Sequence, residues 1–295
     1  GRTMLQLAIP IEPGNSGGPV FKERQVVGIA FQTLNNAENI GEIVPAPIIK
    51  AFLENVGEQD QHQLPGLGMI SQNLENKTLR KTLGLQNSQS GILITSIEYG
   101  GSAYGQLKPR DVVLSIDGNK IANNGTIQFR GLYRTSFETI LGEYPIGTTI
   151  PVEVFRDGRQ QELSITLRER RDLVPRSQYD TLPTYFVFGG LVFLPLSLDF
   201  LSTWDTWWEK APSEFLHYYH SGNRTQKRQE IIVLSQILAD EINSGYENLD
   251  HESILTVNGV QPRDMQHFVQ LIEESETIIE LTTSHSGIIV LIKRK

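Results

Sequence analysis

The apolar residues of this chain fall mostly in short runs that are separated by turn-forming residues. Runs rich in Val, Ile and Leu and bounded by Gly, Asn, Asp or Pro are typical of β-strands, and clear examples are residues 26–30, 91–97 and 112–116. Apolar residues at helical spacing occur at residues 265–272, which predicts a helix there. The pattern therefore predicts a mainly β chain built of small α+β modules.

Length and one polar stretch predict how these modules are divided. A chain of 295 residues exceeds what one hydrophobic core usually organises, so two or three domains are expected. The polar residues 58–63 have the composition of a linker. We predict three segments, with boundaries at residues 1–57, 64–170 and 174–295.

The second half of the chain echoes the first. In the first half, an apolar run at residues 91–97 is followed by a second apolar run at 111–118 that ends in Asp-Gly. In the second half, an apolar run at residues 230–237 is followed by one at 253–259 that ends in Asn-Gly. The second copy continues with the predicted helix and with two further strand-like runs, residues 277–281 and 287–292. We therefore expect two modules of the same type.

The longest apolar stretch, residues 185–198, is the segment of this sequence to consider for insertion into a membrane. A spanning helix needs about 20 apolar residues, and this stretch is shorter. Its aromatic and β-branched residues, its glycine pair and Pro195 favour buried strands with a bend. We expect no insertion into a membrane.

Charge and cysteine content remove several classes of function. The net charge is −8 and acidic and basic residues are interspersed, so the basic stripe of a nucleic-acid-binding surface is missing and no nucleic-acid partner is expected. The absence of cysteine excludes disulfides, zinc–thiolate sites and a cysteine nucleophile. Either an oxidising or a reducing compartment remains compatible with the sequence.

Residues 14–19, Gly-Asn-Ser-Gly-Gly-Pro, carry the most specific chemistry. A serine nucleophile needs a sharp backbone turn whose N–H groups converge on the oxyanion of the tetrahedral intermediate. We predict Ser16 as the nucleophile and the turn Gly14, Asn15 and Ser16 as the oxyanion hole, with the N–H groups of Gly14 and Ser16 as donors. A plain surface turn is the alternative reading of this composition.

Together with residues 26–30 and 40–45, this motif resembles the end of the protease domain in the Deg/HtrA family. In that family a helix closes the domain, and the resemblance implies this helix at residues 47–53. The resemblance implies the last strands of the second β-barrel of a trypsin-like fold. It also implies that Asn15 replaces the Asp that many trypsin-like enzymes pair with a new amino terminus. Activation would then depend on loop rearrangement or assembly.

The sequence has no histidine before Ser16 to serve as the general base that such a serine needs. The family order places the catalytic His and Asp before the serine, but no histidine of this chain precedes Ser16. The six histidines are His62, His217, His220, His251, His267 and His285. We interpret the sequence as the C-terminal part of a longer protease and expect this chain alone to be inactive.

The residues after the linker resemble a PDZ domain of the permuted type found after Deg/HtrA proteases. The resemblance rests on a Gly-Leu-Gly-Met loop at 66–69, the apolar run 91–97, a small-residue turn at 100–103 and the segment 107–118. It implies that a peptide adds to a sheet edge while backbone N–H groups of the glycine loop hold its carboxylate. The expected peptide-binding residues are Gly66, Leu67, Gly68, Met69 and Ile70, with Phe137, Ile140 and Leu141 facing them from a helix.

The last module, from residue 174 onward, resembles the extra C-terminal PDZ-like domain of plant-type Deg proteases. No Gly-Leu-Gly-Phe-like loop precedes it, and an apolar segment around Phe188 and the cluster Trp204, Trp207 and Trp208 stand there instead. The resemblance associates this domain with assembly and regulation. We therefore expect it to pack against neighbours more than to bind free peptides.

Metal and cofactor sites are weakly indicated at most. His217 and His220 lie one helical turn apart and could chelate a metal, but no third ligand of suitable spacing follows, so a solvated helix face is the preferred interpretation. A basic run lies between the two modules, at Arg168, Arg170, Arg171 and Arg176. Its ordinary interpretation is a solvated linker, and anchoring of the neighbouring module is the sharper hypothesis. We expect no metal and no cofactor.

The resemblance implies an ATP-independent serine endopeptidase that cuts damaged or unfolded proteins after small apolar residues, as a trimer or a larger homo-oligomer. Peptide C-termini would be further partners. The periplasm or an organelle (chloroplast or mitochondrion) is the expected location, with the nucleus possible in this family. The alternative is a non-catalytic PDZ scaffold or adaptor in which Ser16 is a relic.

Overall fold

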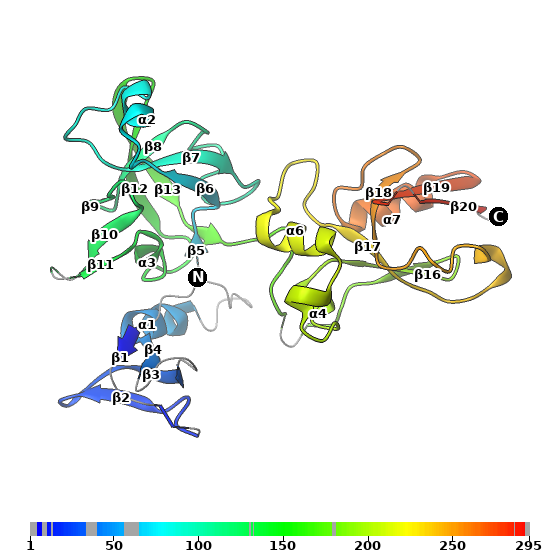
Figure 1. Cartoon of the computed structure of the whole chain (residues 1–295), viewed down its shortest axis with the longest axis horizontal. Coiled ribbons are helices and arrows are strands. Elements are labelled where there is room, and N and C mark those ends of the chain that lie inside the picture. The colour runs from blue at the N-terminus through cyan, green and yellow to red at the C-terminus, as the bar shows by residue number, and fades with distance from the viewer. Residues whose placement is uncertain are drawn as a thin grey trace. The chain divides into compact units, whose positions relative to one another are not determined.

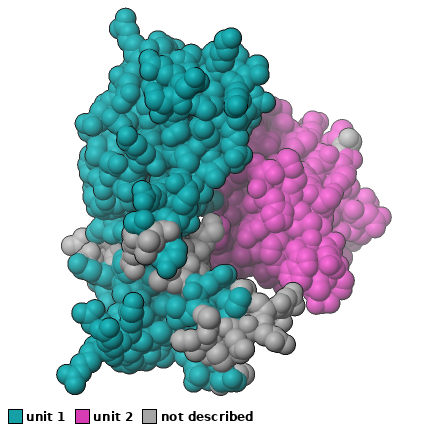
Figure 2. Space-filling view, turned by 60° about the vertical axis from the view of Figure 1, so that its left-hand side comes forward, with its two compact units in different colours: residues 1–170 teal, residues 171–295 magenta. Residues whose placement is uncertain are grey.

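The computed structural model describes residues 5–7, 11–12, 14–33, 40–55, 65–129, 131, 133–178, 181–285 and 287–292, and the predicted linker at 58–63 lies outside them. The chain divides into two compact units, residues 1–170 and 171–295 (Figure 2, teal and magenta). In the described parts, strands of antiparallel sheets dominate and helices are short (Figure 1). The predicted mainly β fold is confirmed.

The first unit begins with a four-stranded antiparallel sheet in the order β1-β4-β3-β2. Its strands are β1 (Leu5–Leu7), β2 (Pro19–Lys22), β3 (Gln25–Thr33) and β4 (Gly41–Pro45), and the helix α1 (Ala46–Asn55) follows directly. The loop between β1 and β2 contains the Gly-Asn-Ser-Gly-Gly-Pro motif. The sheet therefore holds both ends of the loop that carries Ser16.

The same unit continues with a five-stranded antiparallel path in the order β13-β12-β8-β7-β6. Its strands are β6 (Met69–Asn73), β7 (Ile92–Ile97), β8 (Val112–Ile116), β12 (Thr149–Arg156) and β13 (Arg159–Thr166). The smaller elements are β5 (Pro65–Gly66) paired with β14 (Arg168–Glu169), β9 (Asn119–Lys120) on β8, the hairpin β10 (Thr126–Phe129) and β11 (Tyr133–Ser136), and the helices α2 (Lys77–Thr82) and α3 (Glu138–Leu141).

Strand β8 lies at the centre of this module and is buried along its whole length. Val113 and Ile116 belong to the main core cluster, whereas Val112 and Leu114 pack into a second cluster with Phe155. A strand covered on both faces reads as a continuous apolar run rather than an alternating one, which is the pattern seen in the sequence. The run thus fixes the central strand of the module.

The second unit contains a six-stranded antiparallel sheet whose strands follow one another in chain order. They are β15 (Phe186–Phe188), β16 (Leu191–Pro195), β17 (Ile232–Ile237), β18 (Glu252–Val257), β19 (Ile278–Thr283) and β20 (Ile288–Ile292). The helix α7 (Met265–Glu274) buries Met265, Phe268 and Ile272, which share one face at helical spacing.

The apolar stretch at 185–198 forms β15, β16 and the start of the helix α4 (Leu198–Leu201). Between β16 and β17 follow α5 (Trp207–Lys210) and α6 (Ser213–Ser221), and η1 (Glu241–Asn243) precedes β18. Trp204 and Trp207 pack against a small core around Phe215, whereas Trp208 is exposed. Within the described residues, no helix has the length and apolarity needed to cross a membrane.

The two PDZ-like modules share their turn chemistry as well as their strand order. The Asp-Gly turn after β8 and the Asn-Gly turn after β18 place Asp117 and Asn258 in the left-handed region, with φ values of 46° and 48°. The N–H of Asp117 donates to the carbonyl of Pro151 and that of Asn258 to the carbonyl of Glu280, both at 2.8 Å. The echo in the sequence is therefore a repeat in structure.

One buried ion pair ties β8 to β12. Both carboxylate oxygens of Asp111 accept hydrogen bonds from the Arg156 guanidinium, at 2.7 and 2.6 Å, and the N–H of Lys108 also donates to this carboxylate. Asp111 is almost fully buried. The hydrogen bond to Asp111 raises the pKa of Arg156 despite its desolvation. The pair is thus satisfied in both partners.

We predict that Asp111→Asn destabilises this module by about 3–5 kcal/mol, because it leaves the Arg156 charge without its buried counter-charge. Hydrogen exchange of the buried amides of β8 and β12 measures this, since it reports on one sheet of a multidomain chain. The control is Asp157→Asn, an exposed neighbour with φ of 50° that asparagine tolerates. Equal effects of the two substitutions would contradict the prediction.

A second prediction concerns Tyr144, whose hydroxyl donates to the Asp117 carboxylate. Burial and this hydrogen bond raise the pKa of Tyr144 to about 12. A phenol whose folded pKa exceeds its unfolded value of about 10 adds stability below pH 10, and this stability is lost as the pH rises toward 12. Tyr144→Phe should remove one phenol that ionises at unusually high pH from the ultraviolet titration of the nine tyrosines. It should lower the free energy of unfolding below pH 10, and this difference from the wild type should disappear as the pH approaches 12. An unchanged titration curve would refute this assignment.

Candidate functional site

The turn that carries Ser16 is shaped by two glycines. Gly14 and Gly17 have φ values of 96° and 88°, in the region that favours glycine, so the chain reverses sharply on either side of the serine. Ser16 is exposed, and its hydroxyl donates to the carbonyl of Phe31 at 2.8 Å. The structure therefore presents Ser16 at the surface, next to β3.

The hydrogen bonds of this turn leave alternate N–H groups available. The N–H of Asn15 donates to the carbonyl of Glu12, and that of Gly18 donates to the carbonyl of Asn15, both at 3.0 Å. No hydrogen bond joins the N–H of Gly14 or of Ser16 to another residue that the structure describes. Of the three residues predicted to form the oxyanion hole, Gly14 and Ser16 retain a free donor, whereas the N–H of Asn15 is engaged.

The hydroxyl of Ser16 has an acceptor but no base. A peptide carbonyl such as that of Phe31 accepts a hydrogen bond without removing the proton, which is the task of an imidazole. The described residues of the unit that holds Ser16 include no histidine, because His62 lies outside them and the other histidines belong to residues 171–295. The described geometry therefore presents an exposed serine hydroxyl beside two backbone N–H groups that have no acceptor among the described residues, and no described imidazole of this unit can take the hydroxyl proton.

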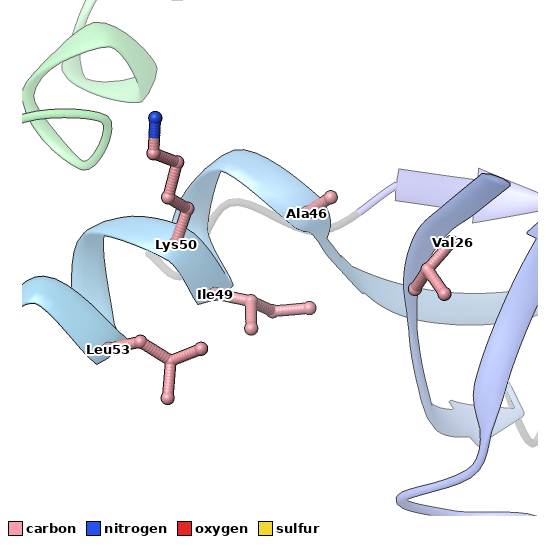
Figure 3. A pocket seen from close by; sticks show the side chains of 5 residues that line it. All are labelled: Val26, Ala46, Ile49, Lys50 and Leu53. Carbon is pink, nitrogen blue, oxygen red and sulfur yellow. The ribbon is translucent and has the colours of Figure 1, made fainter.

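An open apolar hollow of about 340 Å³ lies between β3 and α1 (Figure 3). Val26 faces it from β3, and Ile49 and Leu53 face it from the helix, with Ala46 and Lys50 at its rim. Val26 is 48% exposed and Leu53 62% exposed. The hollow therefore brings exposed apolar side chains of β3 and α1 together at the surface.

The predicted carboxylate-binding loop lies between β5 and β6. Gly68 has a φ of 66°, and a Cβ there would lie 2.9 Å from the Cα of Gly101, so the loop and the small-residue turn touch through their backbones. The carbonyls of Leu67 and Gly68 accept the N–H groups of Ala103 and Glu98, both at 2.8 Å. In the described residues, the N–H groups of Leu67 and Gly68 have no acceptor, which leaves them available to a ligand carboxylate.

The loop leads into a free sheet edge. β6 is the last strand of its sheet and pairs with β7 alone among the described strands. Met69 is half-buried and Ile70 is 38% exposed at the start of this strand. A free edge strand next to unpaired N–H groups is the geometry needed for adding a peptide as one more strand.

The predicted helical residues lie beneath this loop and are more enclosed than expected. Phe137 precedes α3, and Ile140 and Leu141 lie within it; all three are buried in the same core cluster as Leu67. α3 has only four residues, because the hairpin formed by β10 and β11 occupies much of the segment before it. The sequence reading missed this hairpin, although the alternation of polar and apolar residues at 126–129 was a usable signal.

The candidate histidine pair is exposed and has no third ligand. His217 and His220 lie on α6 and point to solvent. The described residues contain no group of three or more His, Cys, Asp or Glu side chains close enough to hold a metal ion. In the basic run, Arg176 pairs with Asp172 at 3.3 Å.

Comparison with known proteins identifies relatives along nearly the whole chain. A family model described as a PDZ domain matches residues 174–295. The chain is 34% identical over 295 residues to "Protease Do-like 4, mitochondrial" of Arabidopsis thaliana, an alignment covering 99% of this chain and 54% of that protein. It is 31% identical over 273 residues to "Protease Do-like 2, chloroplastic" of the same plant, covering 91% and 44%.

A "Serine protease DegP homolog" of Plasmodium falciparum is 23% identical over 374 residues, covering 92% of this chain and 42% of that protein. Among solved structures, "HtrA-type protease AlgW with decapeptide" matches with 24% identity and a TM-score of 0.40, covering 57% of this chain and 49% of that one. The chain thus spans about half the length of the curated relatives it matches. With identity of this level over nine-tenths of its length, the chain belongs to the Deg/HtrA protease family.

Proposed function

We propose that this chain is the C-terminal part of an ATP-independent serine endopeptidase of the Deg/HtrA type, with Ser16 as its nucleophile. The observation that carries the proposal is the exposed Ser16 turn, in which the N–H groups of Gly14 and Ser16 are left without acceptors among the described residues. The names of the relatives, which are those of proteases, support the same reading.

In the proposed mechanism the Ser16 oxygen attacks the carbonyl carbon of the scissile peptide bond. The oxyanion that forms would be held by the N–H groups of Gly14 and Ser16, and one such donor is worth about a hundred- to a thousandfold in rate. A histidine oriented by an aspartate would take the hydroxyl proton and pass it to the leaving amine. Both residues would come from the half of the protease that this chain does not align with.

The same missing half would also cover the exposed apolar surface. In a trypsin-like fold, two β-barrels pack together, and the sheet β1-β4-β3-β2 accounts for part of one barrel. The hollow lined by Val26, Ile49 and Leu53 and the exposed side chains of Phe21 and Phe52 are candidates for that contact. Burying them would stabilise the domain at about 25 cal/mol per Å² of apolar surface.

The substrates we propose are damaged or unfolded proteins, cut after small apolar residues. Their C-termini, or those of other peptides, would bind along the β6 edge with the carboxylate at the loop formed by Gly66, Leu67 and Gly68. The proposed assembly is a trimer or a larger homo-oligomer. The mitochondrial and chloroplastic relatives, and a periplasmic one from Marinomonas, favour an organelle or the periplasm and give no support to the nucleus.

The second candidate is a non-catalytic PDZ scaffold or adaptor. It is favoured by the hydrogen bond that directs the Ser16 hydroxyl to a backbone carbonyl and by the lack of a described histidine in the same unit. The peptide-binding edge of β6 serves both candidates equally. Covalent labelling of Ser16 distinguishes them.

We predict that a fluorophosphonate probe labels Ser16 only when the other half of the protease is present. This chain alone should show neither labelling nor casein cleavage, because no base activates the hydroxyl. A chain extended upstream to include a His and an Asp at protease spacing should show both, and Ser16→Ala should abolish both. A folded, fully assembled parent that neither labels nor cleaves would leave the scaffold as the function.

We predict that Gly68→Ala weakens binding of a C-terminal peptide by about tenfold or more, because the new Cβ pushes the loop away from Gly101. Isothermal titration with a peptide ending in an apolar residue measures the effect. The control is Gly118→Ala, which has nearly the same positive φ (72° against 66°) but no atom within 4 Å of the new Cβ. Similar losses in both variants would show that backbone strain, not the loop, is responsible.

A further inference from the structure

The sheet of the second PDZ-like module has the same strand order as the sheet of the first module and one additional strand, β15. The sheet of the first module ends at β6, in the order β13-β12-β8-β7-β6. The corresponding order in the second module is β20-β19-β18-β17-β16, and it continues to β15. β15 therefore lies on the outer edge of β16, the strand that corresponds to β6. This edge is the one to which a peptide ligand would add.

β15 has the neighbours that a bound peptide would have. It runs antiparallel to β16, with Phe186 opposite Phe193 and Phe188 opposite Leu191. The Phe186 ring packs edge-on against Phe268 of α7, with 6.2 Å between ring centroids, and Phe193 of β16 packs on the same Phe268 ring. α7 is the counterpart of α3, so β15 contacts both the strand and the helix that border the peptide position.

The place of the carboxylate loop is taken by a covalent turn. Gly189 and Gly190 join β15 to β16 with φ values of 60° and 76°, as in a two-residue type I′ hairpin. Their carbonyls accept hydrogen bonds from the buried side-chain amide of Asn243 (2.9 Å) and from the N–H of Leu238 (2.7 Å), respectively. A Cβ on Gly190 would lie 2.4 Å from the Asn243 amide nitrogen, so this end of the groove has no room for a free C-terminus.

We propose that β15 is a tethered internal ligand, which fills the peptide groove of the second PDZ-like module and withholds it from free peptide C-termini. A tethered strand competes at an effective concentration of about a millimolar or more, which excludes ligands of moderate affinity. The inference goes beyond the proposed protease function, because it depends on the sheet orders of the two modules and on contacts within the second one. It leaves the β6 edge as the peptide site of the chain.

The test uses the full chain and a labelled peptide that copies residues 181–188 and ends in a free carboxylate after the phenylalanine. The variant Phe186→Asp removes the contact with Phe268 and should release β15. We expect this variant to bind one more peptide per chain than the wild type, with an affinity gain at the second module of at least about tenfold. The matched control is Val187→Asp, which puts the same charge on a side chain of β15 that is 45% exposed, and it should gain nothing.

A reversible lock checks that the gain comes from movement of β15. Val187 and Val192 are direct partners across the hairpin, at a separation that suits a disulfide, and the chain has no other cysteine. Adding Val187→Cys and Val192→Cys to the Phe186→Asp chain should abolish the gain on oxidation and restore it on reduction. A second binding event in the wild type, or none in a folded Phe186→Asp chain, would overturn the proposal.

Hydrogen exchange of the wild type provides the measurement that does not depend on a folded variant. If β15 occupies the groove, the amides of β15 that face β16 should be protected to the same degree as those of β16. Unprotected β15 amides in the wild type would overturn the proposal, whatever the variants do.

Discussion

Most backbone N–H groups of a folded chain donate to an acceptor, and both candidate sites of this chain lie where the fold leaves such groups without one. At the Ser16 turn, the N–H groups of Asn15 and Gly18 donate to carbonyls of the turn and that of Gly17 donates to Ala30 of β3, whereas those of Gly14 and Ser16 have no acceptor among the described residues. At the glycine loop before β6, the carbonyls of Leu67 and Gly68 are anchored to the turn behind them and their N–H groups are not. In the proposed function, both sites would bind negatively charged oxygen through backbone N–H groups alone.

Backbone sites of this kind explain why glycine is the residue that locates them in the sequence. Gly14, Gly17 and Gly68 all have positive φ, and Gly68 also approaches another backbone too closely for a side chain. The sequence therefore predicts where the turns lie and which residues form them. It could not predict that the N–H of Asn15 would be engaged by Glu12, because that depends on the path of the loop and not on residue type.

The central strand β8 was predictable because burial on both faces makes it a continuous apolar run. The repeat was predictable because an Asp-Gly turn follows β8 and an Asn-Gly turn follows β18. The hairpin β10–β11 and the shortened α3 were not, since the alternation at 126–129 is brief and the segment also reads as a loop. Phe137, Ile140 and Leu141 lie near the loop as expected, but the short helix draws them into the core. Their proposed contact with peptide stays a prediction.

The two PDZ-like modules show how a small difference in sequence changes the use of one sheet edge. In the first, the chain approaches the edge strand through a loop whose carbonyls are tied back, so the edge and its N–H groups remain open. In the second, two glycines of positive φ turn the chain directly onto that edge, and Asn243 and Leu238 fix the turn. Because the hairpin contributes both its own hydrogen bonds and the packing of Phe186 on Phe268, it satisfies the edge at no cost in association entropy. An edge occupied in this way adds stability to its module and contributes no competing peptide site, which leaves the β6 edge as the proposed site of peptide binding.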